Sequence, residues 1–206
     1  MKVVCTADTH GKHEYLDVPD GDIFIFAGDL SEAGNVKSLV DFNSFLGVLP
    51  HKYKIFIDGN HDFAPEKIRK CITNGTYLTH NLLEIGNLKI WGTSWSYWMS
   101  NQIELKKNNH DLMIFWQKIP ERVDILITHF PPYKIGDLTN SGKNLGNRNL
   151  SYALKNIKPK YHVFGHVHEA YGIYKEKIDD FDITCINCSA ISGFGIELKP
   201  SIVFTV

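Results

Sequence analysis

"YKIFIDGNHD", residues 53–62, joins a short run of β-branched and aromatic residues to a cluster of polar side chains that can bind metal ions. Such a run is typical of a buried strand. The same pattern occurs at four other places in the chain: "KVVCTADTHG" (2–11), "DIFIFAGDLSE" (22–32), "DILITHFPP" (124–132) and "YHVFGHVHE" (161–169). The sequence therefore predicts five strands, each with a polar cluster at its carboxyl end.

Segments with helical periodicity lie between these strands, at about residues 35–48, 65–72, 101–117 and 148–157. Strands that alternate with helices indicate right-handed crossovers and largely parallel sheets. In such sheets the strand ends point the same way, and ligands collect at the carboxyl edge. We therefore expect the five polar clusters to converge in space.

Further strand candidates lie at about residues 76–79, 82–86, 88–92, 182–187 and 201–205. They include a hairpin, "LLEIGNLKIWG", with Gly-Asn at its turn. These segments predict a second, mixed sheet packed on the first. The expected fold is α/β, a layered α-β-β-α sandwich of two mixed sheets flanked by helices, with a metal site at the carboxyl ends of the strands.

The size and charge of the chain narrow the function classes. A chain of 206 residues, 43% of them hydrophobic, fits one domain spanning 1–206. Because 22 basic residues balance 23 acidic ones, no extended nucleic-acid or membrane surface is expected, whereas small anionic ligands fit. No signal-peptide core or membrane span is evident, so a cytoplasmic location is predicted. The sequence does not indicate an oligomeric state.

The four cysteines are too few for a disulfide framework. Cys185 and Cys188 form a C-x-x-C pair, but the second pair that a structural zinc site needs is missing. Both are expected to be ordinary buried thiols.

Histidines concentrate in the strand-end clusters. Five of the ten in the chain lie there, including His166 and His168, two residues apart. On extended backbone this spacing directs both rings toward one side. The concentration favours metal binding over packing for the set.

The clusters carry a resemblance to a known family. In chain order, the blocks Asp8-x-His10, Gly28-Asp29, Gly59-Asn60-His61-Asp62, Thr128-His129 and Gly165-His166-x-His168 resemble the complete signature of the calcineurin-like metallophosphoesterases. The compact size and the stretches "GDLSEAG", "FNSFLGVLPHKYKIFIDGNHD", "IPERVDILITHFPP" and "YHVFGHVHEAYG" are similar to its small metallophosphoesterase-domain-containing branch, related to class III cyclic nucleotide phosphodiesterases.

The resemblance implies two divalent metal ions. One would be held by Asp8, His10 and His168, the other by Asn60, His129 and His166, and Asp29 would bridge the two. Imidazole, amide and carboxylate donors suit Mn²⁺, the first expectation, with Fe, Zn²⁺ or Mg²⁺ as alternatives. No cysteine belongs to the set, which argues against a closed thiolate zinc site.

The resemblance also implies a mechanism in which a metal-bridging hydroxide attacks the phosphoryl group. His61 would protonate the leaving group. Glu32 stands where many relatives have an aspartate that pairs with this histidine, so it is expected either to pair with His61 or to be a solvated turn residue. Asp62 is interpreted as a cap or salt-bridge partner at the start of the next helix.

The candidate substrate contacts are Asn60, Phe130 and Arg148. Phe130 stands where many members of the nearest branch have a small residue, and either narrows the site or stacks on a base, or packs in the core. Arg148 lies with Lys143, Asn144 and Asn147 in the long loop 130–149 and could grip a phosphate or sugar. Four aromatic residues either border the site as a wall or pack in the fold: Trp91, Trp95, Tyr97 and Trp98.

The sequence is compatible with three functions. The first is a phosphodiesterase for small phosphodiesters, with cyclic nucleotides leading. The second is a phosphomonoesterase, including a protein phosphatase; the shortness of the chain and the absence of an aspartate-arginine continuation after Gly28-Asp29 count against it. The third is a metal-stabilised binding module without turnover, against which the complete ligand set counts.

Overall fold

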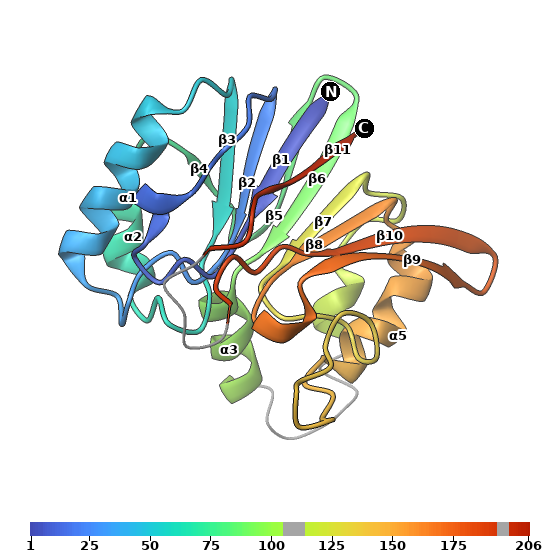
Figure 1. Cartoon of the computed structure of the whole chain (residues 1–206). Helices are drawn as coiled ribbons and strands as arrows, with labels where there is room; N and C mark the ends of the chain where they lie inside the picture. The colour runs from blue at the N-terminus through green and yellow to red at the C-terminus, as the bar shows by residue number, and fades with distance from the viewer. Residues whose placement is uncertain (105–113, 193–197) are drawn as a thin grey trace.

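Two β-sheets stack face to face in the computed structural model, which describes residues 1–104, 114–192 and 198–206 (Figure 1). The five-stranded sheet has the order β11-β1-β2-β3-β4 and comprises β11 (Ile202–Thr205), β1 (Lys2–Thr6), β2 (Ile23–Ala27), β3 (Tyr53–Ile57) and β4 (Thr76–Tyr77). The six-stranded sheet has the order β5-β6-β7-β8-β10-β9 and comprises β5 (His80–Ile85), β6 (Leu88–Thr93), β7 (Ile125–Thr128), β8 (Tyr161–Phe164), β10 (Phe181–Asn187) and β9 (Gly172–Ile178).

Both sheets are mixed, as predicted. β1 to β4 run parallel and β11 joins β1 antiparallel. In the other sheet β6, β7, β8 and β10 run parallel, while the edge strands β5 and β9 are antiparallel to their neighbours. The backbone after β1 also pairs with the backbone after β10: the Ala7 amide donates to the Cys188 carbonyl over 3.0 Å. This contact joins the two sheets at their carboxyl edge.

Helices cover the two outer faces (Figure 1). α1 (Val36–Val48) and α2 (Pro65–Cys71) pack on the five-stranded sheet, where Leu39 and Phe42 of α1 share a hydrophobic cluster with Phe26 of β2. α3 (Trp95–Glu104), a helical segment at 114–117 and α5 (Arg148–Ile157) lie on the six-stranded sheet. Short 3-10 turns occupy η1 (His13–Tyr15) and η2 (His168–Ala170). The α-β-β-α sandwich is thereby confirmed.

The main hydrophobic core lies between the sheets. It combines Ile25 and Ile57 of one sheet with Ile127 and Val163 of the other, all fully buried. Helix starts are fixed by local chemistry: the Asn35 and Asn147 side chains each accept a bond from a backbone N–H in the first turn of α1 and α5. The strands that carry the polar clusters are packed against the core on one face and against helices on the other.

Two elements differ from the predictions. The helix predicted at 101–117 begins earlier, at Trp95; part of the predicted span, residues 105–113, lies outside the described residues. β9 was not predicted. Its sequence, GIYKEKI, is polar because it is an edge strand, where Lys and Glu are common since they prevent pairing with other chains.

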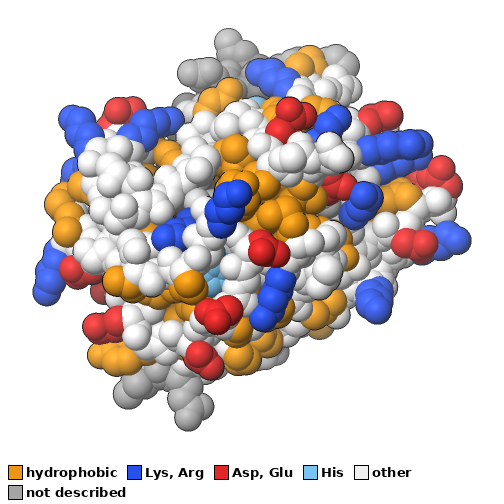
Figure 2. All heavy atoms as spheres, turned by 90° about the horizontal axis from the view of Figure 1, so that it is seen from above, with side chains coloured by type: hydrophobic (Ala, Val, Ile, Leu, Met, Phe, Trp, Pro, Cys, Tyr) orange, Lys and Arg blue, Asp and Glu red, His pale blue; other side chains and the backbone are white. Residues whose placement is uncertain are grey.

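The charge distribution on the surface and the state of the cysteines agree with what the composition predicts. On the face that carries both termini, Figure 2 shows basic and acidic side chains interspersed. Cys185 and Cys188 are free and buried, as expected. Among the described residues, no helix is both long and apolar enough to cross a membrane.

Candidate metal centre

The polar clusters meet at the carboxyl edge of both sheets. Asp8, Asp29 and Asn60 follow β1, β2 and β3, while His129 and His166 follow β7 and β8. Several of these residues adopt left-handed backbone conformations, with φ of 55° at Asp8, 55° at Asp29 and 72° at His166. Such conformations are costly for residues other than glycine and cluster at functional sites. The loops thus turn sharply to direct these side chains inward.

Asp29 lies at the centre of the cluster. Its Oδ2 is 3.5 Å from Nε2 of His129, 3.7 Å from Nε2 of His10 and 4.0 Å from Nε2 of His61. Its Oδ1 accepts a 2.8 Å bond from the His61 amide, which fixes the carboxylate. Burial opposes the charge, but neighbouring His129 outweighs it and lowers the pKa of Asp29. Asp29 is therefore an ionised, buried carboxylate that faces three imidazoles.

Asn60 links two further histidines. Its Oδ1 accepts bonds from Nε2 of His129 over 2.8 Å and from Nδ1 of His166 over 2.9 Å. Nδ1 of His129 donates to the Ala27 carbonyl over 2.9 Å. Because both nitrogens of His129 face acceptors, the ring carries two protons. Burial disfavours that charge, but Asp29 and Asp8 outweigh it and raise the pKa of His129 to about 10.

A metal ion could take the place of the proton on Nε2 of His129. The Ala27 carbonyl keeps Nδ1 protonated, so Nε2 is the nitrogen left to bind a metal once its own proton leaves. His166 is already neutral, since burial and the charge on His129 lower its pKa to about 4. The neutral imidazole is the form that binds metals.

Asp8 supplies an unpartnered buried oxygen. Its Oδ2 accepts from the His166 amide over 2.9 Å and from the Ser189 hydroxyl. Within the described part of the chain, its fully buried Oδ1 has no hydrogen-bond partner. Leaving a charged oxygen in that state is costly unless a cation compensates it.

The spacing around this oxygen fits shared coordination. Oδ1 of Asp8 lies 3.8 Å from Nε2 of His168 and 4.0 Å from Nε2 of His129. Both distances are too long for hydrogen bonds. Ligands bound to one ion at about 2.0–2.2 Å are at most about 4.4 Å apart. The 3.8 Å between Asp8 and His168, which the resemblance assigns to one ion, is therefore a spacing that a metal ion between the two would produce.

Three groups of His, Asp or Glu side chains have ligand atoms within 4.8 Å of one another: Asp8, His10 and His168; His10, Asp29 and His61; and Asp8, Asp29 and His129. With Asn60 and His166, which contact each other and His129, the structure brings together every candidate metal ligand. The donor set of carboxylate, amide and imidazole fits divalent ions such as Mn²⁺ or Zn²⁺.

Asp62 connects two loops by hydrogen bonds and is not a helix cap. It is fully buried and accepts four bonds, from the Leu30 amide, from the amide and hydroxyl of Ser31, and from the Gly59 amide. The N-cap of α2 is Ala64, which makes no side-chain cap. Burial and the nearby Asp29 charge raise the pKa of Asp62 to about 7. Asp62 thus joins the loop carrying Asp29 to the loop carrying Asn60, and the interpretation as a cap was wrong.

Glu32 is exposed on the loop after Asp29. Of the described acidic groups, the one within 4.0 Å of the His61 ring is Asp29, and no bond to Glu32 is present. The structure does not bring the predicted pair together, because the Glu32 side chain points into solvent.

Phe130 belongs to the core and not to a substrate surface. It is 4% exposed, and its ring packs against Trp98 at 4.6 Å, Trp95 at 5.7 Å and Trp116 at 6.0 Å between centroids. The predicted substrate contact at Phe130 is corrected accordingly, since three indole rings cover the phenyl ring.

The long loop 130–149 is organised by Asp137, which accepts bonds from the Lys134 and Gly146 amides and from Asn144. Arg148 starts α5, is exposed, and places its guanidinium 3.6 Å over the ring of Tyr133. No contact of the described residues joins Arg148 to the cluster of ligands. Its role as a substrate contact therefore has no structural support.

Trp95 is the aromatic residue that borders the centre. Its ring stacks on His166 at 5.6 Å with an interplanar angle of 30°, and meets His129 edge-on. Trp91 instead lies in the core. Of the predicted aromatic wall, Trp95 contacts the candidate ligands.

Two residues at the site were missed by sequence reasoning. Ser189 contacts Asp8 from a strand end that carries no charged or imidazole residue. Phe63 is 69% exposed, and its ring lies 6.4 Å from the His61 ring. The signal for Ser189 was its place two residues after the end of β10, which runs parallel beside β8. The signal for Phe63 was an aromatic residue immediately after the Gly59 block.

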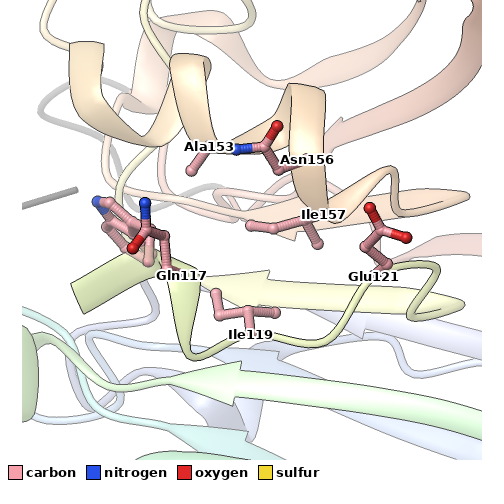
Figure 3. A pocket seen from close by; sticks show the side chains of 7 residues that line it. Gln117, Ile119, Glu121, Ala153, Asn156 and Ile157 are labelled. Atoms are coloured by element: carbon pink, nitrogen blue, oxygen red, sulfur yellow. The ribbon is translucent and has the colours of Figure 1, made fainter. Parts of the chain in front are cut away.

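A separate cavity of about 120 Å³ lies between α5 and the segment 116–121 (Figure 3). Trp116, Ile119, Ala153 and Ile157 give it an apolar lining, and Asn156 and Glu121 border it. None of its lining residues is a candidate metal ligand, so this cavity is not part of the centre.

Comparison with known proteins identifies a family model and several relatives. The model described as calcineurin-like phosphoesterase matches residues 1–170. UPF0046 protein C25E10.12 of Caenorhabditis elegans is 35% identical over 199 residues, covering 84% of this chain and 70% of that protein. Metallophosphoesterase domain-containing protein 1 of Homo sapiens is 31% identical over 231 residues, covering 98% of this chain and 70% of that protein.

Solved structures share the fold. TT1561 of Thermus thermophilus aligns with a TM-score of 0.57 at 13% identity, covering 89% of this chain and 88% of that one. GAP50, the anchor in the inner membrane complex of Plasmodium, aligns with a TM-score of 0.52 at 13% identity, covering 98% and 76%. At these identities the likeness concerns the fold alone.

Proposed function

We propose that this chain, which belongs to the calcineurin-like phosphoesterase family, is a dinuclear metal-dependent phosphodiesterase for small phosphodiesters, with cyclic nucleotides as the leading substrate class. Membership supports a metal-dependent hydrolase of phosphoesters. The observation that carries the proposal is the convergence of three imidazole nitrogens on Oδ2 of Asp29, at 3.5 to 4.0 Å. The chain spans about 70% of the length of each of the two relatives described above. The activity is therefore proposed for this chain and for any longer protein that contains it.

Each candidate ligand receives a role in this proposal. Asp8, His10 and His168 would hold one ion, Asn60, His129 and His166 the other, and Asp29 would lie between them. Mn²⁺ is the first candidate, with Fe, Zn²⁺ or Mg²⁺ as alternatives. When bound, two such ions supply a water-derived nucleophile at neutral pH and neutralise charge on the phosphoryl group.

His61 is the proposed general acid. Its ring is 47% exposed at the rim of the centre, while its backbone amide is anchored on Asp29 by the 2.8 Å bond. The exposed ring can therefore approach a leaving group without losing its backbone position. Proton donation to the departing alkoxide is the role that fits this geometry. Glu32 makes no contact that would orient the ring, so we propose His61 acts without it.

Phe63 replaces Phe130 as the proposed contact for an aromatic part of the substrate. It is exposed beside His61, the proposed proton donor to the leaving group. Stacking of a base on an aromatic ring contributes about 1–3 kcal/mol. A nucleoside leaving group would thus bind over Phe63 while His61 donates its proton.

We also propose that residues 1–206 form one domain. The core between the sheets draws buried residues from both of them, including Ile25, Ile57, Ile127 and Val163. Neither sheet would keep its inner face covered without the other. A cytoplasmic location stays a prediction.

The test is to add Mn²⁺ to the purified chain and compare hydrolysis of an activated aryl phosphodiester with that of its monoester. His166→Ala should abolish turnover. His162→Gln, which alters a buried histidine outside the ligand set, should retain it. Diester turnover would justify assays with 2′,3′- and 3′,5′-cyclic nucleotides. Preference for the monoester would indicate a phosphatase, and metal binding without turnover would indicate a binding module.

A further inference from the structure

The segment Asn187–Ser189, at the carboxyl end of β10, lies beyond the part of the chain that the family model matches, yet it enters the candidate metal centre. Its backbone runs beside the residue that precedes Asp8. The Ala7 amide donates to the Cys188 carbonyl over 3.0 Å, and the Ala190 amide donates to the Ala7 carbonyl over 2.8 Å. The segment is therefore held in register with Asp8.

Ser189 contacts Asp8 directly. The serine is fully buried, and its hydroxyl donates to Oδ2 of Asp8. Its amide donates to Oδ1 of Asn187 over 3.1 Å. Because the ionised carboxylate can only accept, the direction of the hydroxyl bond is settled. Hydrogen bonds to a charged acceptor are stronger than those between neutral groups.

This bond makes the two oxygens of Asp8 unequal. Oδ2 accepts from the Ser189 hydroxyl and from the His166 amide over 2.9 Å. Oδ1 is buried and has no hydrogen-bond partner among the described residues. Two donors on one side prevent the carboxylate from rotating and leave the other oxygen facing His168 and His129.

Asn187 supports the neighbouring ligands in the same way. It is fully buried, and its Nδ2 donates to the Val167 carbonyl over 2.9 Å and to the Gly136 carbonyl over 3.0 Å. Val167 separates His166 from His168. One short segment therefore holds both the carboxylate and the turn that carries two candidate histidine ligands.

We propose that Ser189 is a positioning residue of the metal centre, whose hydroxyl holds Asp8 so that Oδ1 alone is presented to the metal. Asn187 orients Ser189 and the turn between His166 and His168. The inference rests on the metal-binding part of the proposed function. Groups that orient metal ligands typically change metal affinity by about 10–100-fold when they are removed.

The test is calorimetric titration of the full chain with Mn²⁺, comparing wild type with Ser189→Ala. The matched control is Ser201→Ala, another buried serine, whose hydroxyl donates to the Asp17 carbonyl over 3.2 Å. We expect Ser189→Ala to weaken one of two Mn²⁺ sites by about 10–100-fold and the control to change neither. The visible absorption of bound Co²⁺ should change in Ser189→Ala alone, which a purely structural role would not produce.

Each outcome decides the question. Mn²⁺ affinities within about twofold of wild type in Ser189→Ala, with an unchanged Co²⁺ spectrum, would overturn the positioning role while leaving the proposed function intact. A wild-type chain that binds no Mn²⁺ would overturn both. If Ser189→Ala does not fold, Ser189→Gly, which also removes the hydroxyl and adds no metal-binding group, is measured against the same criteria.

Discussion

Replacing Gly165 by alanine should strongly weaken metal binding, because the added methyl group would occupy the space of the Asp8 carboxylate. A Cβ at this position would overlap Oδ2 of Asp8 and lie 2.7 Å from Cβ of Ala7. The backbone cannot withdraw freely, since the Gly165 amide donates to the His129 carbonyl over 3.0 Å. The carboxylate must therefore rotate and lose the donors on Oδ2.

The substitution should lower both the stability of the chain without metal and the extra stability that Mn²⁺ gives. Overpacking of a buried site costs about 1–3 kcal/mol of the free energy of unfolding. A displaced Asp8 should weaken Mn²⁺ binding by at least about 100-fold, which removes about 2.7 kcal/mol of metal-linked stabilisation at saturating metal. In a chain of this size 1 kcal/mol corresponds to about 2–4 °C, so the melting shift produced by Mn²⁺ should shrink by about 5–11 °C.

The assay is thermal unfolding with and without Mn²⁺, followed by circular dichroism. Gly142→Ala is the matched control, because its φ is +77° and a Cβ there meets nothing within 4 Å. It should cost about 1 kcal/mol of backbone strain and keep the full Mn²⁺ shift. A wild-type Mn²⁺ shift in Gly165→Ala would refute the reasoning, since Asp8 could then not be a ligand in the observed geometry.

Four further outcomes are expected. Burial lowers the pKa of His162 to about 3, so between pH 6.5 and 3 the unfolded chain binds a proton that the folded chain does not. The free energy of unfolding should therefore fall by up to about 1.4 kcal/mol per pH unit as the pH drops through this window, and His162→Gln should flatten that slope in urea titrations; an unchanged slope would contradict this. His61→Gln should slow hydrolysis of a diester with a poor leaving group by about 10²–10⁴-fold, with less effect on an activated aryl ester, while metal content stays that of wild type; lost metal would make His61 a ligand. Asp62→Asn should lower the melting temperature, because either orientation of the amide places an NH₂ against donors and costs about 1–3 kcal/mol; equal melting temperatures would rule out this connection between the loops. Phe63→Ala should raise KM for a nucleoside diester by about 5–150-fold and leave KM for a methyl diester unchanged, and equal changes for both would remove the stacking role.

Sequence alone was enough for the layered fold and for the convergence of the candidate ligands. Parallel strands present their carboxyl ends at one edge, so residues as far apart as Asp8 and His168 could be expected together from the position of each after its strand. The three residue types involved are those that bind divalent ions, and their spacing is local to each strand end. β9 was not predicted because the charges of an edge strand obscure the alternation of a half-buried one.

Tertiary structure alone decided which neighbours each side chain has. Phe63 and Phe130 both follow a ligand cluster, yet three indole rings cover Phe130 and solvent surrounds Phe63. In the sequence Ser189 is an ordinary residue at the exit of a strand, and its partner Asp8 lies 181 positions away in the chain. Periodicity and motif spacing report which face or end of an element a residue occupies, because they depend on the local backbone. Burial and hydrogen-bond partners depend on what the rest of the chain packs against that place, so they arise only when the two sheets come together.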